Sequence, residues 1–207
     1  MEFFEYEKEN SREKGSFNIE KKSNLFEVAE DIFEKKEFKE GDIVLIDNDE
    51  TIHNTIQNIL YGLDPLENLP EDAKIFLEMC EEKNIQKAIV TNMPRTGHYM
   101  NHEIPVFGYD HYYEKGILKN IEFPLTLCLG SLYKQTERSI YEIAHWVISN
   151  REEEGRVAWI GNSPLDKGFG LRLDKVLREE HFDSDFYMYR LPWIRSFCSD
   201  ILKYEKI

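Results

Sequence analysis

Two adjoining stretches, Ile43-Val44-Leu45-Ile46 and Asp47-Asn48-Asp49-Glu50-Thr51, indicate both the fold and the place where chemistry could occur. The first is an uninterrupted apolar run, which is typical of a strand buried on both faces of a parallel sheet. The second places two carboxylates, Asp47 and Asp49, directly after that strand, at the edge where open α/β sheets bind ligands. Two close negative charges are unfavourable unless a cation neutralises them or a reaction uses them. A simple acidic turn would give the same pattern, because Asp and Asn also favour turns.

Beyond this stretch, apolar runs of strand length alternate with patterns of helical spacing. Strands are expected at 43–46, 88–90, 125–129, 157–160 and 186–189, and helices at about 24–36, 73–84, 135–148 and 169–177. Such alternation is typical of right-handed βαβ units, in which helices cover both faces of a parallel sheet. The sequence therefore predicts an α/β fold with a three-layer, Rossmann-like sheet, formed by a single domain over residues 24–207. Residues 1–23 are highly charged and weakly patterned, so we expect a charged leader or a peripheral element there.

The composition limits the kinds of partner. A chain of 207 residues with 41% hydrophobic and 13% aromatic content can bury one core. The net charge of −14 argues against a surface for duplex nucleic acid or an anionic membrane, since both attract clustered Lys and Arg. No stretch stays apolar for the length of a membrane span. Cys80, Cys128 and Cys198 lie far apart in apolar contexts, which favours free thiols in a cytoplasmic setting.

Polar residues follow three of the expected strands, and a lysine precedes one of the expected helices. They are Asp47 and Asp49, Thr91 and Asn92, Asn162 and Asp166, and Lys134. Because the carboxyl ends of parallel strands share one edge, we expect these side chains to converge. A carboxylate can attack a phosphorus atom only when Mg²⁺ and a fixed cation offset the repulsion between two anions. A hydroxyl and an ammonium can bind phosphoryl oxygens, so the set suits phosphoryl transfer.

In these motifs the chain resembles the haloacid dehalogenase superfamily, whose members are mostly Mg²⁺-dependent phosphatases. The resemblance rests on DxDxT after an apolar run at Asp47–Thr51, a strand-ending Thr91, a helix-leading Lys134, and GxxxxD after an apolar run at Gly161–Asp166. The matched frame covers about residues 41–175, and the order of the four motifs is more specific than the second or third motif alone. The resemblance implies a phosphohydrolase, a phosphomonoesterase that works through an aspartyl-phosphate intermediate.

The resemblance also implies a role for each motif residue. Asp47 would be the nucleophile, and Asp49 the general acid that later activates water as a base. Phosphate binding would fall to Thr91, Asn92 and Lys134. The cofactor Mg²⁺ would be held by the Asp47 carboxylate, the main-chain carbonyl of Asp49, and the fourth motif with Asn162 and Asp166.

The fourth motif leaves alternatives open. Most phosphatases of the superfamily have Asp where this chain has Asn162, so Mg²⁺ affinity would fall unless Asp166 coordinates directly. Asn at this motif also occurs in metal-independent 2-haloacid dehalogenases of the superfamily, but these lack the second aspartate, here Asp49. We therefore expect a phosphatase. A catalytically weak phospho-ligand or protein-binding module is the first alternative, and a dehalogenase is the second.

Two site residues also have a plain structural interpretation. Lys134 could be a solvated lysine at a helix start, and the cation would then come from Lys115, Lys119 or Lys167. Asp166 could serve as the N-cap of the helix that follows it.

The intervals between the motifs are short. About 40 residues separate the first two motifs, and the expected helix takes part of them. The remaining residues, about 20, are too few to form a helical lid. We therefore expect a small cap or none. Within the superfamily, an open site goes with larger substrates such as proteins, nucleic-acid ends or lipid headgroups, and the acidic charge of this chain disfavours the last two. A small phosphorylated metabolite stays an alternative if residues 93–124 fold over the cleft. The sequence indicates no oligomeric state.

Overall fold

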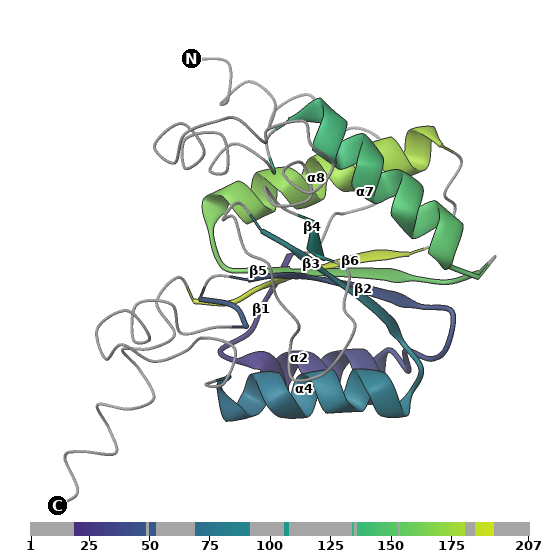
Figure 1. The fold of residues 1–207 in the computed structure, drawn as a ribbon. Coiled ribbons are helices and arrows are strands. Elements are labelled where there is room, and N and C mark those ends of the chain that lie inside the picture. The colour runs from purple at the N-terminus through teal and green to yellow at the C-terminus, as the bar shows by residue number, and fades with distance from the viewer. Residues whose placement is uncertain are drawn as a thin grey trace, which may run out of the picture.

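The computed structural model describes most of the sheet and its helices (Figure 1). The described residues are 19–48, 50–52, 69–91, 106–107, 134, 136–152, 154–180 and 185–192. Within these ranges, no helix combines the length and the apolar content that crossing a bilayer requires.

The described strands form one sheet in which every neighbouring pair is parallel. They are β1 (Ile19–Lys21), β2 (Ile43–Asp47), β3 (Gln86–Val90), β4 (Val106–Phe107), β5 (Val157–Gly161) and β6 (Phe186–Arg190), and their order across the sheet is β1-β6-β5-β2-β3-β4. Strand β2, which carries the decisive apolar run, lies in the middle between β5 and β3.

Helices cover both faces of this sheet (Figure 1). One face carries α2 (Leu25–Ala29), its π-helical continuation η2 (Glu30–Lys35) and α4 (Glu71–Glu82), and the other carries α7 (Glu137–Asn150) and α8 (Pro164–Glu179). This distribution agrees with right-handed crossovers. With that handedness, connections that move across the sheet in one direction place their helices on one face, and connections that move in the other direction place them on the opposite face. The connections through α2 and α4 move from β1 towards β3, whereas those through α7 and α8 move from β4 towards β6.

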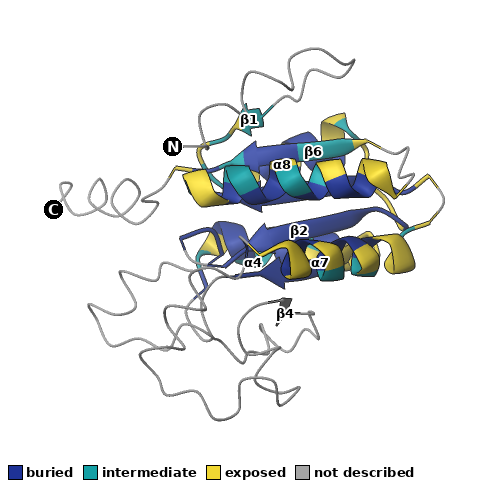
Figure 2. Cartoon of the chain, turned by 90° about the horizontal axis from the view of Figure 1, so that it is seen from above, coloured by how far each residue is buried: buried dark blue, intermediate teal, exposed yellow. Residues whose placement is uncertain are grey.

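The core consists of two apolar layers separated by the sheet. All five residues of β2 are buried, and alternate side chains contribute to opposite layers, with Val44 and Ile46 on the α4 face and Ile43 and Leu45 on the α8 face. Figure 2 shows the buried strands beneath α7 and α8, whose outward sides are exposed.

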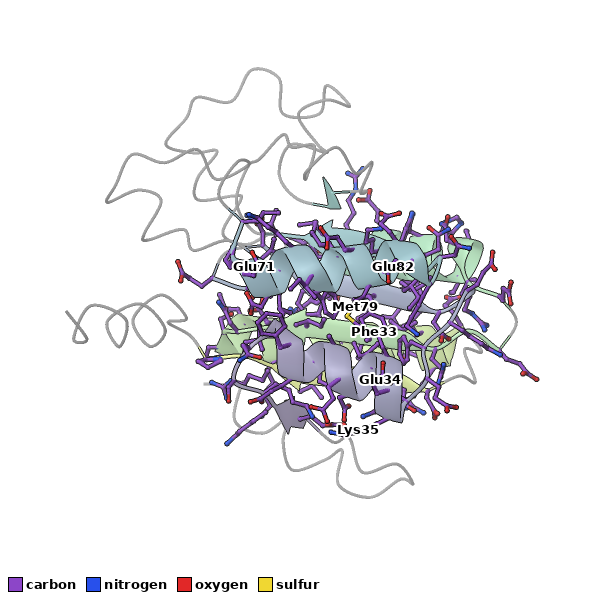
Figure 3. All side chains as sticks on the ribbon, turned by 90° about the horizontal axis from the view of Figure 1, so that it is seen from below. Phe33, Glu34, Lys35, Glu71, Met79 and Glu82 are labelled. Atoms are coloured by element: carbon purple, nitrogen blue, oxygen red, sulfur yellow. The ribbon has the colours of Figure 1, made fainter. Side chains whose placement is uncertain are left out.

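On the opposite face, apolar side chains fill the space between the two helical segments. Phe33 of η2 and Met79 of α4 lie between these helices (Figure 3), and the ring of Phe33 is 5.6 Å from that of Phe76. Cys80 is a buried free thiol there, and burial raises its pKa to about 12. Cys128 and Cys198 are outside the described residues.

The α/β fold and most of its elements are confirmed. The described structure has the strands expected at 43–46, 88–90, 157–160 and 186–189 and the helices expected at 24–36, 73–84, 135–148 and 169–177. Most of their ends shift by one or two residues, but α8 begins at Pro164, five residues earlier than expected, because the capping box at Ser163 starts the helix there. The expected strand at 125–129 is outside the described residues. Residues 19–21, assigned to the leader or peripheral element, form the edge strand β1, so the domain begins no later than Ile19.

Strand β1 is linked to the neighbouring elements by a partly buried charged network around Asp31. The Asp31 carboxylate accepts a 2.7 Å hydrogen bond from the Tyr189 hydroxyl and another from the Lys36 ammonium, and Lys22 Nζ lies 3.4 Å from it. Lys36 also donates to Glu20 of β1 at 2.7 Å. Burial alone would raise the pKa of the Asp31 carboxyl, but the hydrogen bonds from Lys36 and Tyr189 lower that pKa from 3.8 to about 2.

This network predicts an acid-sensitive contribution to stability. A carboxyl whose pKa is lower in the folded state stabilises the fold above its unfolded pKa, and that stabilisation is lost as the pH falls from about 4 to about 2. We expect urea denaturation across this window to show a loss of about 2 kcal/mol in the wild type that is missing in Asp31→Asn. Glu30→Gln, which alters an exposed ion pair with Lys35, should keep the wild-type pH dependence. Equal pH dependence in wild type and Asp31→Asn would contradict the assignment.

Candidate active site

The candidate site lies where the direction of the strand order reverses. The chain passes from β2 to β3 on one side of β2 and later enters β5 on its other side, and open α/β sheets bind ligands at the carboxyl ends of strands at such a point. Asp47 is the last residue of β2, and Asn162 directly follows β5. The register pairs Ile46 with Ile160, so both polar residues leave the sheet at the same edge.

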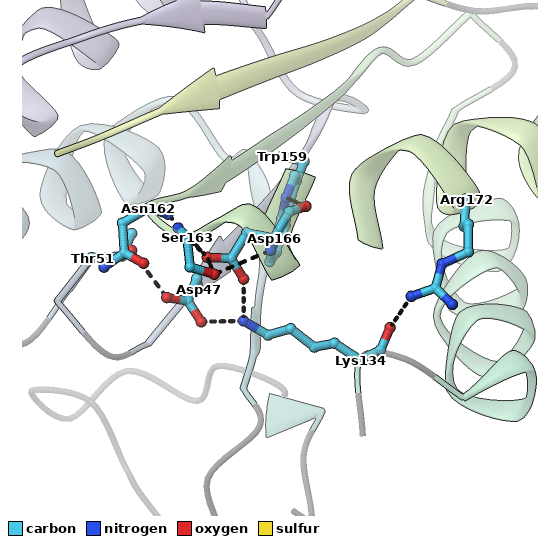
Figure 4. Close-up of polar contacts among 8 residues, drawn as sticks. All are labelled: Asp47, Thr51, Lys134, Trp159, Asn162, Ser163, Asp166 and Arg172. Carbon is cyan, nitrogen blue, oxygen red and sulfur yellow. Dashed lines mark hydrogen bonds and ion pairs between the residues drawn. The ribbon is translucent and has the colours of Figure 1, made fainter. Parts of the chain in front are cut away.

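The Lys134 ammonium joins two of the expected acids at this edge. It donates one hydrogen bond to Oδ1 of Asp47 and another, of 2.7 Å, to Oδ1 of Asp166 (Figure 4). The three side chains are buried, and Lys134 is only 2% exposed. Lys134 is 87 positions from Asp47 and 32 from Asp166 in the chain, so their meeting is a product of the fold.

Asp166 is oriented by the start of helix α8. The N-cap is Ser163, whose hydroxyl accepts a hydrogen bond from Asp166 N, while Asp166 Oδ2 accepts from Ser163 N at 2.8 Å and from Asn162 N at 3.0 Å. This reciprocal arrangement is a capping box, with Pro164 in the first turn. The interpretation of Asp166 as the N-cap itself is therefore wrong. One of its oxygens completes the capping box and the other contacts Lys134.

A tryptophan and an arginine support the lysine. The Lys134 ammonium lies 5.3 Å from the ring centroid of Trp159, within the range of a cation–π contact. The Trp159 indole N–H donates to the main-chain carbonyl of Asp166 at 2.9 Å. Arg172 of α8 donates from Nη2 to the main-chain carbonyl of Lys134 at 3.1 Å. Both ends of Lys134 are thus in contact with residues of the core and of α8.

The turn after β2 fixes the other oxygen of Asp47. Oδ2 accepts a 3.1 Å hydrogen bond from the Thr51 hydroxyl, and Ile52 N donates to Asn48 O at 3.0 Å. Glu50 has a φ of +58°, in the left-handed region that non-glycine residues adopt mainly in tight turns or at functional sites. Thr51, the last residue of the DxDxT motif, therefore orients the carboxylate of Asp47, the first residue of the motif.

Electrostatics keep the lysine and the fourth-motif acid charged at neutral pH. Burial alone would lower the pKa of the Lys134 ammonium, but the nearby Asp47 and Asp166 carboxylates raise it above its ordinary value of 10.5. Burial alone would raise the pKa of the Asp166 carboxyl, whereas Lys134 and the donors of Ser163 bring it below its ordinary value of 3.8. With Asp47 also ionised, the cluster would hold two negative charges and one positive charge.

The other expected site residues fall in different categories. Thr91 follows β3 and is buried, and the register pairs its neighbour Val90 with Asp47, so Thr91 lies at the same edge of the sheet. Asp49 and Asn92 are outside the described residues. Of the alternative lysines, Lys115 and Lys119 are also outside them, and Lys167 lies in the first turn of α8. Among the described residues it is Lys134 that binds both acids.

The donors at this edge fit a hard divalent cation. Mg²⁺ prefers oxygen ligands and usually takes one or two carboxylates, with water or phosphate completing its shell. Asp47 and Asp166 supply two carboxylates that bind the same ammonium and are therefore close together, and the Asn162 amide oxygen follows β5 at the same edge. Within the described residues, no group of three or more His, Cys, Asp or Glu side chains is suited to hold a metal ion.

Sequence reasoning missed three supporting residues. The role of Ser163 as an N-cap could have been predicted, because Ser-x-x-Asp with proline after the serine is close to the capping-box pattern. Trp159 looked like an ordinary core residue of a strand, and its indole N–H could not be assigned a partner. Arg172 lies on a helix with several charged residues, and no local pattern distinguishes it from an exposed arginine such as Arg178.

Comparisons with protein-family models, with curated proteins and with solved structures find no match for this chain. The chemistry of the site must therefore be inferred from the residues themselves, from their burial, and from their positions at the edge of the sheet.

The close approach of the fourth-motif acid to β5 gives a test of this geometry. A Cβ added at Gly161 would lie 2.5 Å from Asp166 Cβ, whereas one added at Gly168 in α8 would meet nothing within 4 Å. We expect Gly161→Ala to lower the free energy of unfolding by about 1–3 kcal/mol through this overlap, measured by urea denaturation. Gly168→Ala should be neutral or stabilising by up to about 1 kcal/mol, because alanine favours helix. Equal stability of the two variants would rule out the described packing.

Proposed function

We propose that this protein is a Mg²⁺-dependent phosphohydrolase of the haloacid dehalogenase type, a phosphomonoesterase that acts through an aspartyl-phosphate. The observation that carries the proposal is the buried contact of Lys134 with both Asp47 and Asp166 at the point where the strand order reverses. A strand-ending carboxylate beside a fixed ammonium is the arrangement that attack on an anionic phosphoryl group requires.

The proposed reaction has two steps. An oxygen of Asp47 attacks the phosphorus atom, the bond from phosphorus to the leaving oxygen breaks, and Asp49 gives its proton to that oxygen. A water molecule then attacks the phosphorus of the aspartyl-phosphate and passes a proton to Asp49. The bond from phosphorus to the Asp47 oxygen breaks, which restores the Asp47 carboxylate and releases inorganic phosphate. Each step transfers one phosphoryl group and one proton, and no oxidant or reductant is needed.

The contacts of Asp47 suit the role of nucleophile. Thr51 donates to one of its oxygens and Lys134 to the other, which fixes the plane of the carboxylate. A carboxylate oxygen has two lone-pair sites, so an oxygen that accepts one hydrogen bond can still attack. The Lys134 ammonium would also attract the oxygens of the incoming phosphoryl group, which lowers the repulsion between the two anions.

Asp47, Asp166, Asn162 and the main-chain carbonyl of Asp49 would hold Mg²⁺. When bound, the ion would neutralise charge on the phosphoryl oxygens. Thr91 and Asn92 are the proposed partners of the phosphoryl group on the β3 side. We expect the substrate to be a phosphorylated molecule, and an open site could accept one as large as a protein. We expect the protein to act in the cytoplasm. The net charge of −14 disfavours duplex nucleic acid.

The nucleophile is the first residue to test. We expect Asp47→Asn to lower the hydrolysis of p-nitrophenyl phosphate by a factor on the order of 10³ or more, because the amide cannot form the phosphoenzyme. Acid-quenched wild type should gain the mass of one phosphoryl group, and the variant should not. Hydrolysis that persists in Asp47→Asn at the wild-type rate would rule out this nucleophile.

A second candidate, a phosphate-binding module with little turnover, is favoured by Asn162, which brings no negative charge to the fourth motif. Asn162→Asp separates the two functions. For a phosphatase we expect this variant to lower the Mg²⁺ concentration for half-maximal activity by about tenfold, since ligand charge raises cation affinity. For a binding module, the wild type binds phosphate without turnover at millimolar Mg²⁺, and the variant gains turnover.

The control for this substitution is Asn150→Asp, which adds the same charge at the far end of α7, where the side chain is exposed. It should leave the Mg²⁺ dependence unchanged. A wild type that releases halide from a 2-haloacid in the presence of chelator would instead support the dehalogenase alternative.

A further inference from the structure

Arg172 connects helix α8 to the segment that carries the site lysine. Its guanidinium donates two hydrogen bonds. Nη2 donates to the Lys134 carbonyl at 3.1 Å (Figure 4), and Nε donates to the Gly168 carbonyl of its own helix at 3.2 Å. Gly168 is one turn earlier in α8, so the first bond holds the guanidinium against the helix and the second reaches away from it. Neither acceptor is a carboxylate. In these two hydrogen bonds the arginine therefore binds main chain.

The same helix thus holds Lys134 at both ends. Asp166 in the first turn of α8 binds the ammonium, and Arg172 further along α8 binds the carbonyl. A lysine side chain has a flexible four-carbon stem with many rotamers, so an ammonium is placed accurately only when its stem and its main chain are both constrained. A displacement of about 1 Å in a reactive group can cost about 10²-fold in rate.

We propose that Arg172 is a positioning residue, which fixes the main chain of Lys134 so that the ammonium reaches the phosphoryl group. This inference rests on the proposed function. In that reaction the Asp47 carboxylate loses its negative charge when it becomes an acyl phosphate, and its attraction for the Lys134 ammonium weakens at that moment. The bond from Arg172 to a main-chain carbonyl does not change during the reaction, so it keeps Lys134 in place through both steps.

The geometry explains why this residue is arginine. A guanidinium has donors on a rigid planar fork and can serve two separate carbonyls, whereas an ammonium has all its donors on one nitrogen. Arg172→Lys keeps the charge and loses the fork, and Arg172→Met loses both. If positioning is the role, the two variants should behave alike. If only the charge matters, Arg172→Lys should resemble the wild type.

A double-mutant cycle tests whether Arg172 acts through Lys134, with inorganic phosphate as the probe and isothermal titration calorimetry as the measurement. We expect Arg172→Met and Arg172→Lys each to weaken phosphate binding by about tenfold. In the background of Lys134→Met, Arg172→Met should cause no further loss, because the group that it positions is gone. Arg178→Met is the matched control, since Arg178 lies on the same helix and pairs with Asp174 on its exposed side. It should bind phosphate like the wild type.

Lys134→Met leaves two buried carboxylates without their ammonium, so this variant could fail to fold. In that case chemical rescue tests the positioning role. Guanidinium ion at low millimolar concentration should restore phosphate binding to Arg172→Met and leave the binding by Arg178→Met unchanged. Equal losses from Arg172→Met in both backgrounds, no loss at all, or no rescue would overturn the positioning role.

The cycle uses binding, so it separates this inference from the proposed function. A wild type that binds phosphate but does not hydrolyse esters would overturn the phosphatase and leave the positioning role standing if the cycle is non-additive. A wild type that neither binds phosphate nor hydrolyses esters would overturn both.

Discussion

The contact of one ammonium with two carboxylates, Lys134 with Asp47 and Asp166, is the interaction on which the site depends. Moving three charges out of water costs several kcal/mol per ion, and the attraction within a buried cluster offsets this cost only when the geometry is good and the remaining donors and acceptors are satisfied. Here Thr51 and the first turn of α8 supply those additional hydrogen bonds. The site is therefore a set of mutually dependent groups, and none of its three charges would be stable there alone.

The topology makes this contact possible. Strands β2 and β5 are neighbours because the chain reverses its direction across the sheet, although more than a hundred residues separate their sequences. Their carboxyl ends then carry Asp47 and Asn162 to one edge, and α8 leaves that edge at once with Asp166 in its first turn. Lys134, which precedes α7, meets Asp47 and Asp166 at the same edge. Position in the fold, rather than proximity in the chain, defines the site.

Much of this was predictable from the sequence, for identifiable reasons. The run Ile43–Ile46 has no polar residue to interrupt it, and burial on both faces is the stable outcome for such a strand. Lys134 could be expected at the site only through its place in the order of motifs, because a lysine before a helix has no local signature. The edge strand at Ile19–Lys21 was missed because its short, charged sequence is stabilised by pairing with β6, which is far away in the chain. Arg172 was missed because its partner at the site is the main-chain carbonyl of Lys134, which is distant in the chain and leaves no side-chain pattern in the sequence.

Asp166 shows how closely the fold and the site depend on each other. Its Oδ2 completes the capping box that starts α8, and its Oδ1 binds the Lys134 ammonium, so one carboxylate satisfies helix and site together. The absence of a Cβ at Gly161 leaves room for this carboxylate beside β5. The capping box itself needs only an acceptor at this position, and the more usual glutamate would be longer by one methylene. An acceptor at this position serves the helix, and the short aspartate also places its other oxygen against the Lys134 ammonium.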